Sequence, residues 1–259
     1  MALTNVQITH VRNLQRVVLQ GLQDVNLFYG PNGSGKTSVL EAIHLLGMAR
    51  SFRGNSIKSL ITHEKESCTV FGMTTPGSVG GIGEGRAGGL GLPLGVQRCR
   101  SGEAQIKVGG KVARTLATLA EQLPLQVITA DSFDLLTGSP GARRRYLDWG
   151  VFHVEQPFFD QWKRFQRCLK QRNNLLRRGK VSGQELQAWT HDLAEAGTAV
   201  NRYRKAYFQM LLPRFREIMA RLAPSLNDLE LRYQQGWDRQ LGYGEALQQG
   251  LAGDTDQGY

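Results

Sequence analysis

Residues 30–37 have the types and spacing of a phosphate-binding loop. They read GPNGSGKT and match the pattern GxxxxGK[ST] at every position. Glycines at 30, 33 and 35 let the backbone wrap closely around phosphate oxygens, so that successive N–H groups form an anion cradle. The segment therefore predicts a nucleoside triphosphate site formed by Gly30, Pro31, Asn32, Gly33, Ser34, Gly35, Lys36 and Thr37.

The last two residues of this loop supply the remaining chemistry. The ammonium of Lys36 is expected to reach the β- and γ-phosphates, and the hydroxyl of Thr37 to ligate a Mg²⁺ ion that bridges them. ATP and Mg²⁺ are the predicted cofactors. A chance glycine-rich turn is the alternative, but such a turn rarely lies between a strand and a helix as this segment does.

The flanking patterns place the loop between two regular elements. Residues 3–8 alternate in polarity and residues 25–29 form a short apolar run, so both are predicted to be strands. After the loop, Val39, Leu40, Ile43 and Leu46 recur at helical spacing and predict a helix from about Thr37 to near Gly47.

Hydrolysis of ATP requires a further acidic residue at the end of a hydrophobic strand. Residues 125–128 are the final strand candidate, and Asp131 follows them, but Gln126 and Thr129 interrupt the run. Asp131 is therefore a poor match to a Mg²⁺-binding acid, and the catalytic residue stays unassigned. Residues 181–184, VSGQ, imitate a signature motif but are predicted to be a loop.

The composition favours a globular protein with a polyanionic partner. The 259 residues include 32 Lys plus Arg against 22 Asp plus Glu, a formal charge of +10. This excess favours nucleic acid, although plain solubility is the alternative. Three widely spaced cysteines, Cys68, Cys99 and Cys168, predict reduced thiols. No leader or membrane-spanning segment is evident, so we expect no membrane partner and a cytoplasmic protein.

Two lobes are predicted. Residues 1–130 form a nucleotide-binding lobe, in which the stretch from Cys68 to Val112 is an antiparallel sheet with a hairpin turn at Gly109 and Gly110. Residues 76–95 are glycine-rich and receive no role. Residues 131–259 form a basic helical lobe, with helices near 142–153, 156–178, 184–208 and 213–222 and with starts or kinks at Pro157 and Pro213.

The densest positive run lies in the second lobe. Residues 161–184 contain no acidic residue and carry eight basic ones. They predict a non-specific DNA contact, with a merely solvated basic face as the alternative. Trp162, Phe165 and Leu169 recur at helical spacing and are assigned to a buried stripe. The basic residues are Lys163, Arg164, Arg167, Lys170, Arg172, Arg177, Arg178 and Lys180.

Six ordered segments of the sequence can be compared with known families, and the phosphate-binding loop lies within the second of them. The segments are VRNL at 11–14, YGPNGSGKTSVLEAIHLLG at 29–47, ARSFRG at 49–54, LAEQLPLQVITADSF at 119–133, LLTGSPGARRRYLDWGVFH at 135–153 and LKQRNNLL at 169–176. In this order and spacing they resemble the RecF family of the ABC/SMC-like ATPase superfamily.

The resemblance implies an α/β fold: a P-loop ABC-type ATPase head with an antiparallel β section and a helical second lobe. It further implies an ATP-binding, DNA-binding protein that acts in recombinational repair of single-strand gaps, in replication and in SOS induction. ATP would drive homodimerisation on gapped duplex or single-strand/duplex junctions, with mediator proteins of the RecR and RecO type as partners. A C-terminal return carrying the signature, Walker B and D-loop is expected to be absent here, so we expect ATP binding with little or no turnover.

The resemblance also implies roles for residues outside the loop. Arg12 and Asn13 match an early element near the nucleotide, with a surface arginine as the alternative for Arg12. Arg53 lies in a polar loop that could approach the γ-phosphate or DNA. Arg143, Arg144 and Arg145 belong to a characteristic segment without an assigned role, and Asp148 is expected to pair with one of them. A small P-loop kinase or a non-hydrolysing DNA-binding scaffold are the alternative functions.

Overall fold

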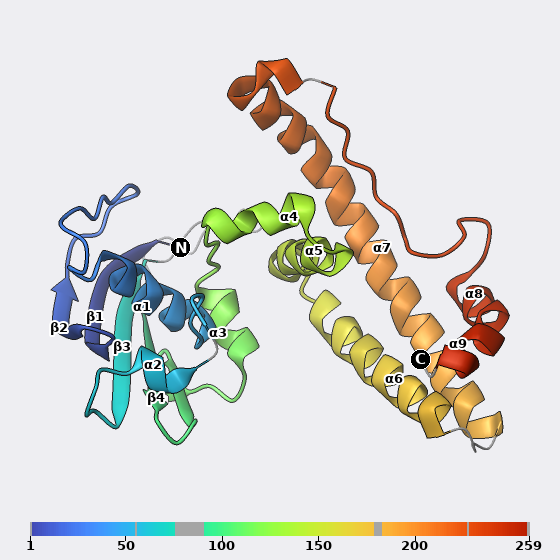
Figure 1. The fold of residues 1–259 in the computed structure, drawn as a ribbon, viewed down its shortest axis with the longest axis horizontal. Coiled ribbons are helices and arrows are strands. Elements are labelled where there is room, and N and C mark those ends of the chain that lie inside the picture. Colours follow the sequence, from blue (N-terminus) through green and yellow to red (C-terminus); the bar gives the residue numbers. More distant parts are fainter. Residues whose placement is uncertain (1, 55, 76–90, 179–182, 227, 258–259) are drawn as a thin grey trace. The chain divides into compact units, whose positions relative to one another are not determined.

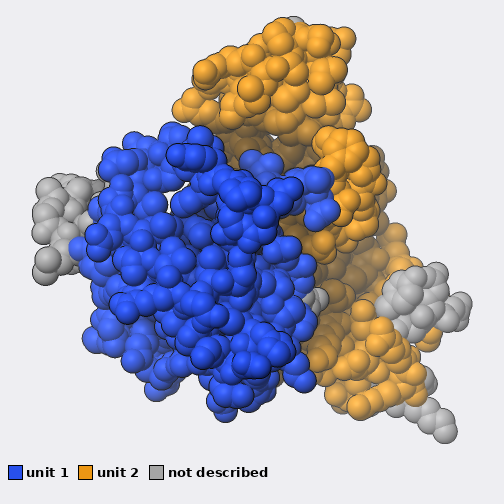
Figure 2. Space-filling view, turned by 60° about the vertical axis from the view of Figure 1, so that its left-hand side comes forward, with its two compact units in different colours: residues 1–132 blue, residues 133–259 orange. Residues whose placement is uncertain are grey.

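A computed structural model gives the structure of residues 2–54, 56–75, 91–178, 183–226 and 228–257. The chain divides into two compact units, Met1–Ser132 and Phe133–Tyr259, which Figure 2 distinguishes by colour. Among the described residues, no helix combines the length and apolar character that crossing a membrane requires.

Unit 1 is built on one antiparallel sheet (Figure 1). Its strands are β1 (Leu3–Val11), β2 (Leu14–Leu19), β3 (Ser67–Thr74), β4 (Leu92–Cys99), β5 (Ala104–Val108) and β6 (Lys111–Val112), in the order β2-β1-β3-β4-β5-β6. The predicted antiparallel section is thus confirmed and also includes the N-terminal hairpin. Gly109 and Gly110, both with positive φ, form the predicted turn between β5 and β6.

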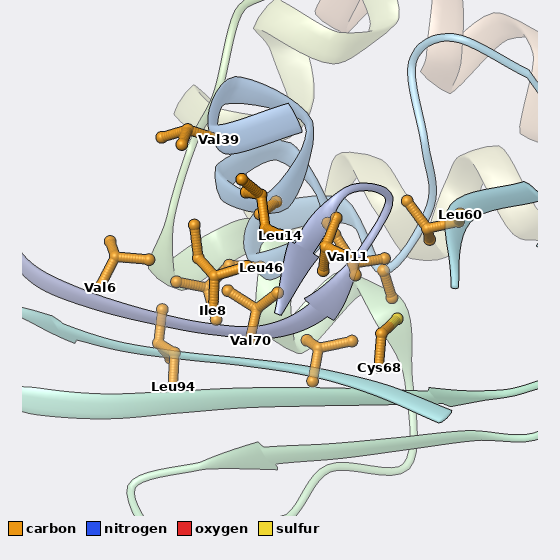
Figure 3. Packing of buried hydrophobic residues seen from close by; sticks show 14 of the residues in the cluster. Val6, Ile8, Val11, Leu14, Val39, Leu46, Leu60, Cys68, Val70 and Leu94 are labelled. Atoms are coloured by element: carbon orange, nitrogen blue, oxygen red, sulfur yellow. The ribbon is translucent and has the colours of Figure 1, made fainter. Parts of the chain in front are cut away.

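One face of the sheet is covered by helix α1 (Lys36–Met48). Ile8, Val70 and Val96 lie opposite one another across β1, β3 and β4 and are almost fully buried. Figure 3 shows the labelled side chains of these strands on the same side as Leu46 of α1. A Cβ at Gly72 would lie 2.4 Å from Leu46, so this glycine lets the helix approach the sheet. Burial of each such aliphatic side chain contributes about 1.5–3 kcal/mol.

The buried stripe of α1 differs in part from the predicted one. Val39 and Leu46 are buried as expected, but Leu40 is about half exposed. Ala42 and Leu45 are fully buried instead, and Glu41 is buried with them. Two short helices complete the unit, α2 (Ile57–Leu60) and α3 (Leu116–Gln122), and the hydroxyl of Thr115 accepts a hydrogen bond from the Thr118 N–H at the start of α3.

The strand predictions for residues 25–29 and 125–128 are wrong. Neither segment is a strand, and the first exposes Val25, Leu27 and Tyr29 by 82–88%. Ile128 of the second is also exposed. An apolar run becomes a strand only where a neighbouring strand accepts its backbone hydrogen bonds, and within the described residues neither run has such a neighbour.

Unit 2 consists of helices: α4 (Asp134–Thr137), α5 (Pro140–Val154), α6 (Phe158–Arg178), α7 (Gly183–Leu222), α8 (Tyr243–Gln249) and α9 (Leu251–Gln257). Short 3-10 turns lie at Ala130–Phe133 and Pro224–Leu226. Helices α6 and α7 lie side by side (Figure 1). Val151, Phe158 and Val200 form a buried cluster, and the partly buried Trp162 and Phe165 of the predicted stripe pack against it. Leu169, the third residue of that stripe, is also only partly buried.

Helix α7 continues through Pro213, where the sequence suggested a start or kink. The predicted segments 184–208 and 213–222 are therefore a single 40-residue helix. A proline inside a helix removes one backbone hydrogen bond. Pro213 lies on the exposed side, where water can satisfy the freed carbonyl. Of the glycine-rich segment 76–95, residues 76–90 lie outside the described residues, whereas residues 92–95 are the first part of strand β4 and not of a loose insertion. Part of the VSGQ segment also lies outside the described residues, and Gly183 and Gln184 begin α7.

Candidate nucleotide-binding site

The phosphate-binding loop is held open by glycine geometry. Gly30, Gly33 and Gly35 have φ values of 145°, 82° and 95°, which residues with a Cβ rarely adopt. A Cβ at Gly35 would also lie 2.6 Å from Leu14, so this position excludes larger residues for two reasons. Helix α1 begins immediately afterwards at Lys36. Successive N–H groups and the helix N-terminus thus make the cradle that a triphosphate requires.

The side chains of the loop are arranged around this cradle. The ammonium of Lys36 donates to the carbonyl oxygens of Gly30 and Pro31, each at 2.8 Å. Thr37 is exposed and lines the adjacent cavity together with Asn32. Ser34, Gly30 and Pro31 shape the loop but do not line the cavity.

Asn13 braces the loop from the β1–β2 turn. Its Nδ2 donates to the Gly33 carbonyl at 2.9 Å, and its Oδ1 accepts from the Ser38 hydroxyl at 2.9 Å. The amide therefore connects the middle of the loop to the first turn of α1. Its side chain is committed to these two bonds, although Asn13 also lines the cavity.

Arg12, beside Asn13 in the same turn, is anchored by a buried carboxylate. Its Nε donates to Glu41 Oε2 at 2.9 Å and its Nη2 to Glu41 Oε1 at 2.7 Å, a bidentate pair. Its Nη1 donates to the Ser59 carbonyl at 2.6 Å. Arg12 has a positive φ of 56°, a conformation that costs a non-glycine residue about 1–2 kcal/mol. The ion pair and the local backbone bonds offset that strain.

Glu41 is the shared partner of three side chains. It has no exposed surface, and besides Arg12 it accepts from the Ser51 hydroxyl and lies 3.8 Å from Arg53 Nη1. Burial alone would raise the pKa of Glu41, but the hydrogen bonds from Arg12 and Ser51 and the nearby positive charges lower it below its usual value. Glu41 is therefore a stable anion at neutral pH, and we call Arg12, Glu41, Ser51 and Arg53 the Glu41 cluster.

The cavity beside the loop is large and positively charged. Its volume is about 790 Å³. Besides the loop, it is lined by residues from the β1–β2 turn, from the segment that runs from the end of α1 through α2 to His63, and by Arg100 directly after β4, all within unit 1. Outside the loop, the sequence predicted Arg12, Asn13 and Arg53 of this lining but not Lys58, Ser59, Ile61, His63 or Arg100. The cationic or titratable lining residues are Arg12, Lys36, Arg53, Lys58, His63 and Arg100.

Asp131 is not part of this cavity. It lies in the 3-10 turn Ala130–Phe133 and is exposed. None of the acidic residues in the described part of the chain lines the cavity, since Glu41 is buried behind Arg12 and Arg53. The described residues also contain no cluster of histidine, cysteine and acidic side chains that could hold a metal.

Comparison with known proteins assigns the family. Residues 2–211 match the RecF/RecN/SMC N-terminal domain. A protein of Pseudomonas aeruginosa named DNA replication and repair protein RecF is 47% identical over all 259 residues, which span 67% of its length. The protein of the same name in Azotobacter vinelandii is 46% identical over the whole chain and 68% of its own length. This chain belongs to the RecF family.

The fold of this RecF-family chain agrees with that assignment. A solved structure of the recombination mediator protein RecF-ATP in the RecFOR pathway matches 99% of the chain and 69% of its own length, with a TM-score of 0.80 at 22% identity. A second solved structure, of RecF-ATPrS, matches with a TM-score of 0.79 at 23% identity. The expected RecF/SMC ATPase-head fold with an antiparallel sheet and a helical second lobe is confirmed.

The basic run on α6 is less positive than its sequence suggested. Lys163 pairs with Asp160 and lies over the Phe159 ring. Arg164 pairs with both Asp192 and Glu195 of α7. Arg167 lies over the Trp189 ring. The acidic partners come from outside residues 161–184. A count of charges along that run therefore overestimated its net positive charge. Lys170 and Arg178 are exposed, as is Arg177, whereas Lys180 lies outside the described residues.

Arg172 is wrongly predicted as a DNA contact. Its side chain is 2% exposed, and its Nη2 donates to Asp254 of α9 at 2.7 Å. A guanidinium enclosed by protein on the inner side of α6 cannot reach a phosphate backbone. Its role is to hold α9 against α6.

The three consecutive arginines of α5 have different surroundings. The Nη1 of Arg143 donates to the carbonyls of Leu135, Leu136 and Gly138, and so closes the end of α4. Arg144 and Arg145 are exposed and line a second cavity. The expected pairing of Asp148 with one of these arginines is wrong, because Asp148 pairs with Arg204 at 2.6 Å and 2.8 Å.

Proposed function

We propose that this chain is an ATP- and DNA-binding protein of RecF type that acts in recombinational repair of single-strand gaps and in replication. The observation that carries the proposal is the glycine cradle opening onto a cavity of about 790 Å³ with several convergent cations. Such a cavity lies within the range of about 300–1,000 Å³ usual for small-molecule sites. In this proposal, unit 1 binds the nucleotide and unit 2 makes part of the contact with DNA.

The residues present fit ATP with Mg²⁺. A Cβ at Gly35 would collide with Leu14, so the loop keeps the open backbone that phosphate oxygens need. The Lys36 ammonium would exchange its bonds to the Gly30 and Pro31 carbonyls for the β- and γ-phosphates. Thr37 would supply a hydroxyl ligand to Mg²⁺, which when bound neutralises phosphate charge. Asn13 would keep the loop in register with α1, and Arg12 would present its fixed guanidinium at the cavity wall.

Titration with a fluorescent ATP analogue and Mg²⁺ tests this site. Lys36→Ala should weaken binding by at least about tenfold, because it removes the only cation of the loop itself. Lys65→Ala is the matched control, since Lys65 lies outside the cavity lining. Equal affinities for the two variants would defeat the assignment of residues 30–37 as the nucleotide site.

DNA is the proposed macromolecular partner. The relatives named DNA replication and repair protein RecF, the net charge of +10 and the exposed cations of α6 support it. ATP-dependent homodimers would engage gapped duplex or single-strand/duplex junctions, together with mediator proteins of the RecR and RecO type. A protein acting on chromosomal DNA in this way would be cytoplasmic in a bacterium. Arg53, at the edge of the ATP cavity, is the proposed DNA or γ-phosphate contact nearest the nucleotide.

We further propose that the chain binds ATP and turns it over very slowly. No acidic side chain of the described residues lines the cavity to hold Mg²⁺ or orient a water molecule. A multiple-turnover rate well above background that Lys36→Ala abolishes would contradict this part. Asp131→Asn would then show whether that carboxylate supplies the missing ligand.

Two other functions are less well supported. A small P-loop kinase would transfer phosphate to a small acceptor, but family membership over the whole chain opposes it. A scaffold with a decayed P-loop would not keep Lys36, Thr37 and three glycines in positive-φ positions. Phosphate transfer to an added acceptor, or DNA binding indifferent to ATP, would favour the first or the second respectively.

A further inference from the structure

A second cavity lies within the helical unit. Its volume is about 460 Å³, and it is bounded by α5, α6, α7 and the segment from Gln235 to Tyr243. Every lining residue belongs to unit 2. The lining combines arginines, aromatic rings and side-chain amides, a set that differs from an apolar packing defect. The charged and aromatic lining residues include Arg144, Arg145, Asp148, Arg204, Trp237 and Tyr243.

Among the described residues, Asp148 is the one carboxylate that lines this cavity, and it is already paired. Asp148 accepts two hydrogen bonds from Arg204 and a third from Trp162 Nε1 at 3.2 Å. Within the part of the chain that the structure describes, Arg144 and Arg145 form no ion pair. The cavity therefore carries a surplus of about two positive charges, each on an exposed guanidinium. Guanidinium groups bind phosphate oxygens through two parallel N–H groups, so an anionic phosphate is the group they fit.

An aromatic wall lies in the same cavity. The rings of Trp237 and Tyr243 are 4.4 Å apart and tilted by 31°. Gly197 of α7 makes room for this wall, because a Cβ there would lie 2.3 Å from Tyr243 Cε1. Tyr243 is thus held by close packing against α7, and Trp237 packs on Tyr243. Planar aromatic surface beside an unpaired phosphate-binding group is the combination with which proteins bind single-stranded nucleic acid.

We infer that this cavity binds one nucleotide of single-stranded DNA, with the base against Trp237 and Tyr243 and a backbone phosphate between Arg144 and Arg145. The inference rests on the proposed DNA-binding function and assigns it a site in unit 2. The side-chain amide of Gln166 lies in the same lining, where it can face the edge of a base. Asn201 and Gln235 also line the cavity, but Asn201 accepts from the Tyr233 hydroxyl and Gln235 donates to the Asp238 carbonyl. An acidic peptide of a partner protein would use the two arginines but would leave the aromatic wall without a planar ligand.

The test is the affinity of the full chain for a fluorescent oligothymidylate of about ten nucleotides at fixed salt. Arg144→Ala/Arg145→Ala should weaken binding by about tenfold or more. Arg214→Ala/Arg221→Ala removes the same charge from exposed positions on α7 outside the cavity and should change it less than about threefold. Trp237→Leu should weaken binding about tenfold through lost stacking. Trp237→Phe should keep the affinity within about threefold and lose most of the oligonucleotide-induced quenching of tryptophan fluorescence.

The outcomes separate this inference from the function it rests on. Circular dichroism first establishes that each variant is folded. If the wild-type chain binds ATP but no DNA of any kind, the proposed DNA function fails and this inference fails with it. If wild type binds the oligonucleotide and the cavity and control variants behave alike, only this inference is overturned. It is also overturned if the cavity variants weaken duplex and single strand equally, or if they impair only the binding of a mediator protein.

Discussion

The cations around the cavity beside the phosphate-binding loop and the cations of α6 differ in what they face. Around the cavity, Arg12 is fixed by Glu41 from behind, and Lys36, Arg53 and Arg100 line the same space. On α6, Arg164 and Lys163 pair with nearby carboxylates, and Arg172 is buried against Asp254. A binding site therefore requires convergence of charges on one space, and a high local density of basic residues is not sufficient.

Replacement of Glu41, which anchors Arg12 and Arg53 at the cavity, is expected to have the largest effect. Glu41→Gln should destabilise the protein by about 3 kcal/mol, because it leaves the Arg12 guanidinium partly buried beside a neutral amide. ATP affinity should fall as well, since Arg12 and Arg53 lose their shared partner. Chemical denaturation and ATP titration measure the two effects. Glu66→Gln, at an exposed position, is the matched control and should change neither.

The same anchor predicts a dependence on pH. The pKa of Glu41 is lowered in the folded protein, so its contribution to stability is fully present above its unfolded pKa of about 4.3. It is lost as the pH falls through the folded value. The stability difference between wild type and Glu41→Gln should therefore be constant from about pH 5 to 7 and shrink below about pH 4.3. A difference that instead grew toward acid would show that Glu41 is not stabilised as the anion.

On the α6 side, the largest expected effect is on stability and not on DNA. Arg172→Ala should cost about 3 kcal/mol, because it leaves Asp254 without its partner and opens space under α9. The variant is expected to fold with reduced stability and to bind DNA with the same affinity as wild type. Loss of DNA binding without a change in stability would show that Arg172 contacts DNA after all. Arg172→Met, which keeps much of the side-chain volume, should be less destabilising than Arg172→Ala.

The backbone conformation of the phosphate-binding loop requires glycine at position 35. Gly35→Ala should destabilise the protein by about 2 kcal/mol, because Gly35 has a φ of 95° and an added Cβ would meet Leu14. ATP binding should weaken with it. Gly54→Ala is the control, since no heavy atom lies within 4 Å of the added Cβ and its φ is not positive. Equal stability of the two variants would mean that the loop does not require glycine at position 35.

The smallest effects are expected among the exposed cations of α6. Lys170→Ala should weaken DNA binding by about two- to threefold and reduce its salt dependence, because Lys170 has no ion pair among the described residues. Arg164→Ala should change it less, since Asp192 and Glu195 already hold that guanidinium. Measurement of DNA affinity across a salt series distinguishes the two. A larger effect for Arg164 would show that paired cations still dominate the contact.

The sequence predicted what is local and missed what joins distant segments. The loop at 30–37 is encoded by eight adjacent residues, and the predicted strand–helix setting was half right, because α1 formed but the strand at 25–29 did not. The Glu41 cluster unites positions 12, 41, 51 and 53. One signal was present: Glu41 lies at helical spacing between Ser38 and Leu45, on the buried side of α1. A carboxylate there requires a cation.

The charge of unit 2 was misjudged for the same reason. No acidic residue interrupts 161–184, but α7 and α9 bring Asp192, Glu195 and Asp254 to that helix. These carboxylates neutralise α6 only because the helices pack together, and a count of charges along the chain carries no information about that packing. Conversely, the consecutive arginines 143–145 gave no indication of their separate roles, since successive helical residues point in different directions.

The most direct test of the central claim is the affinity for gapped duplex DNA with and without Mg²⁺-ATP, measured on one preparation across a salt series. We expect that ATP strengthens wild-type binding by at least about fivefold, that the binding weakens steeply with salt, and that Lys36→Ala removes the effect of ATP while retaining weak DNA binding. Identical DNA affinity with and without ATP, in a protein that demonstrably binds ATP, would contradict it.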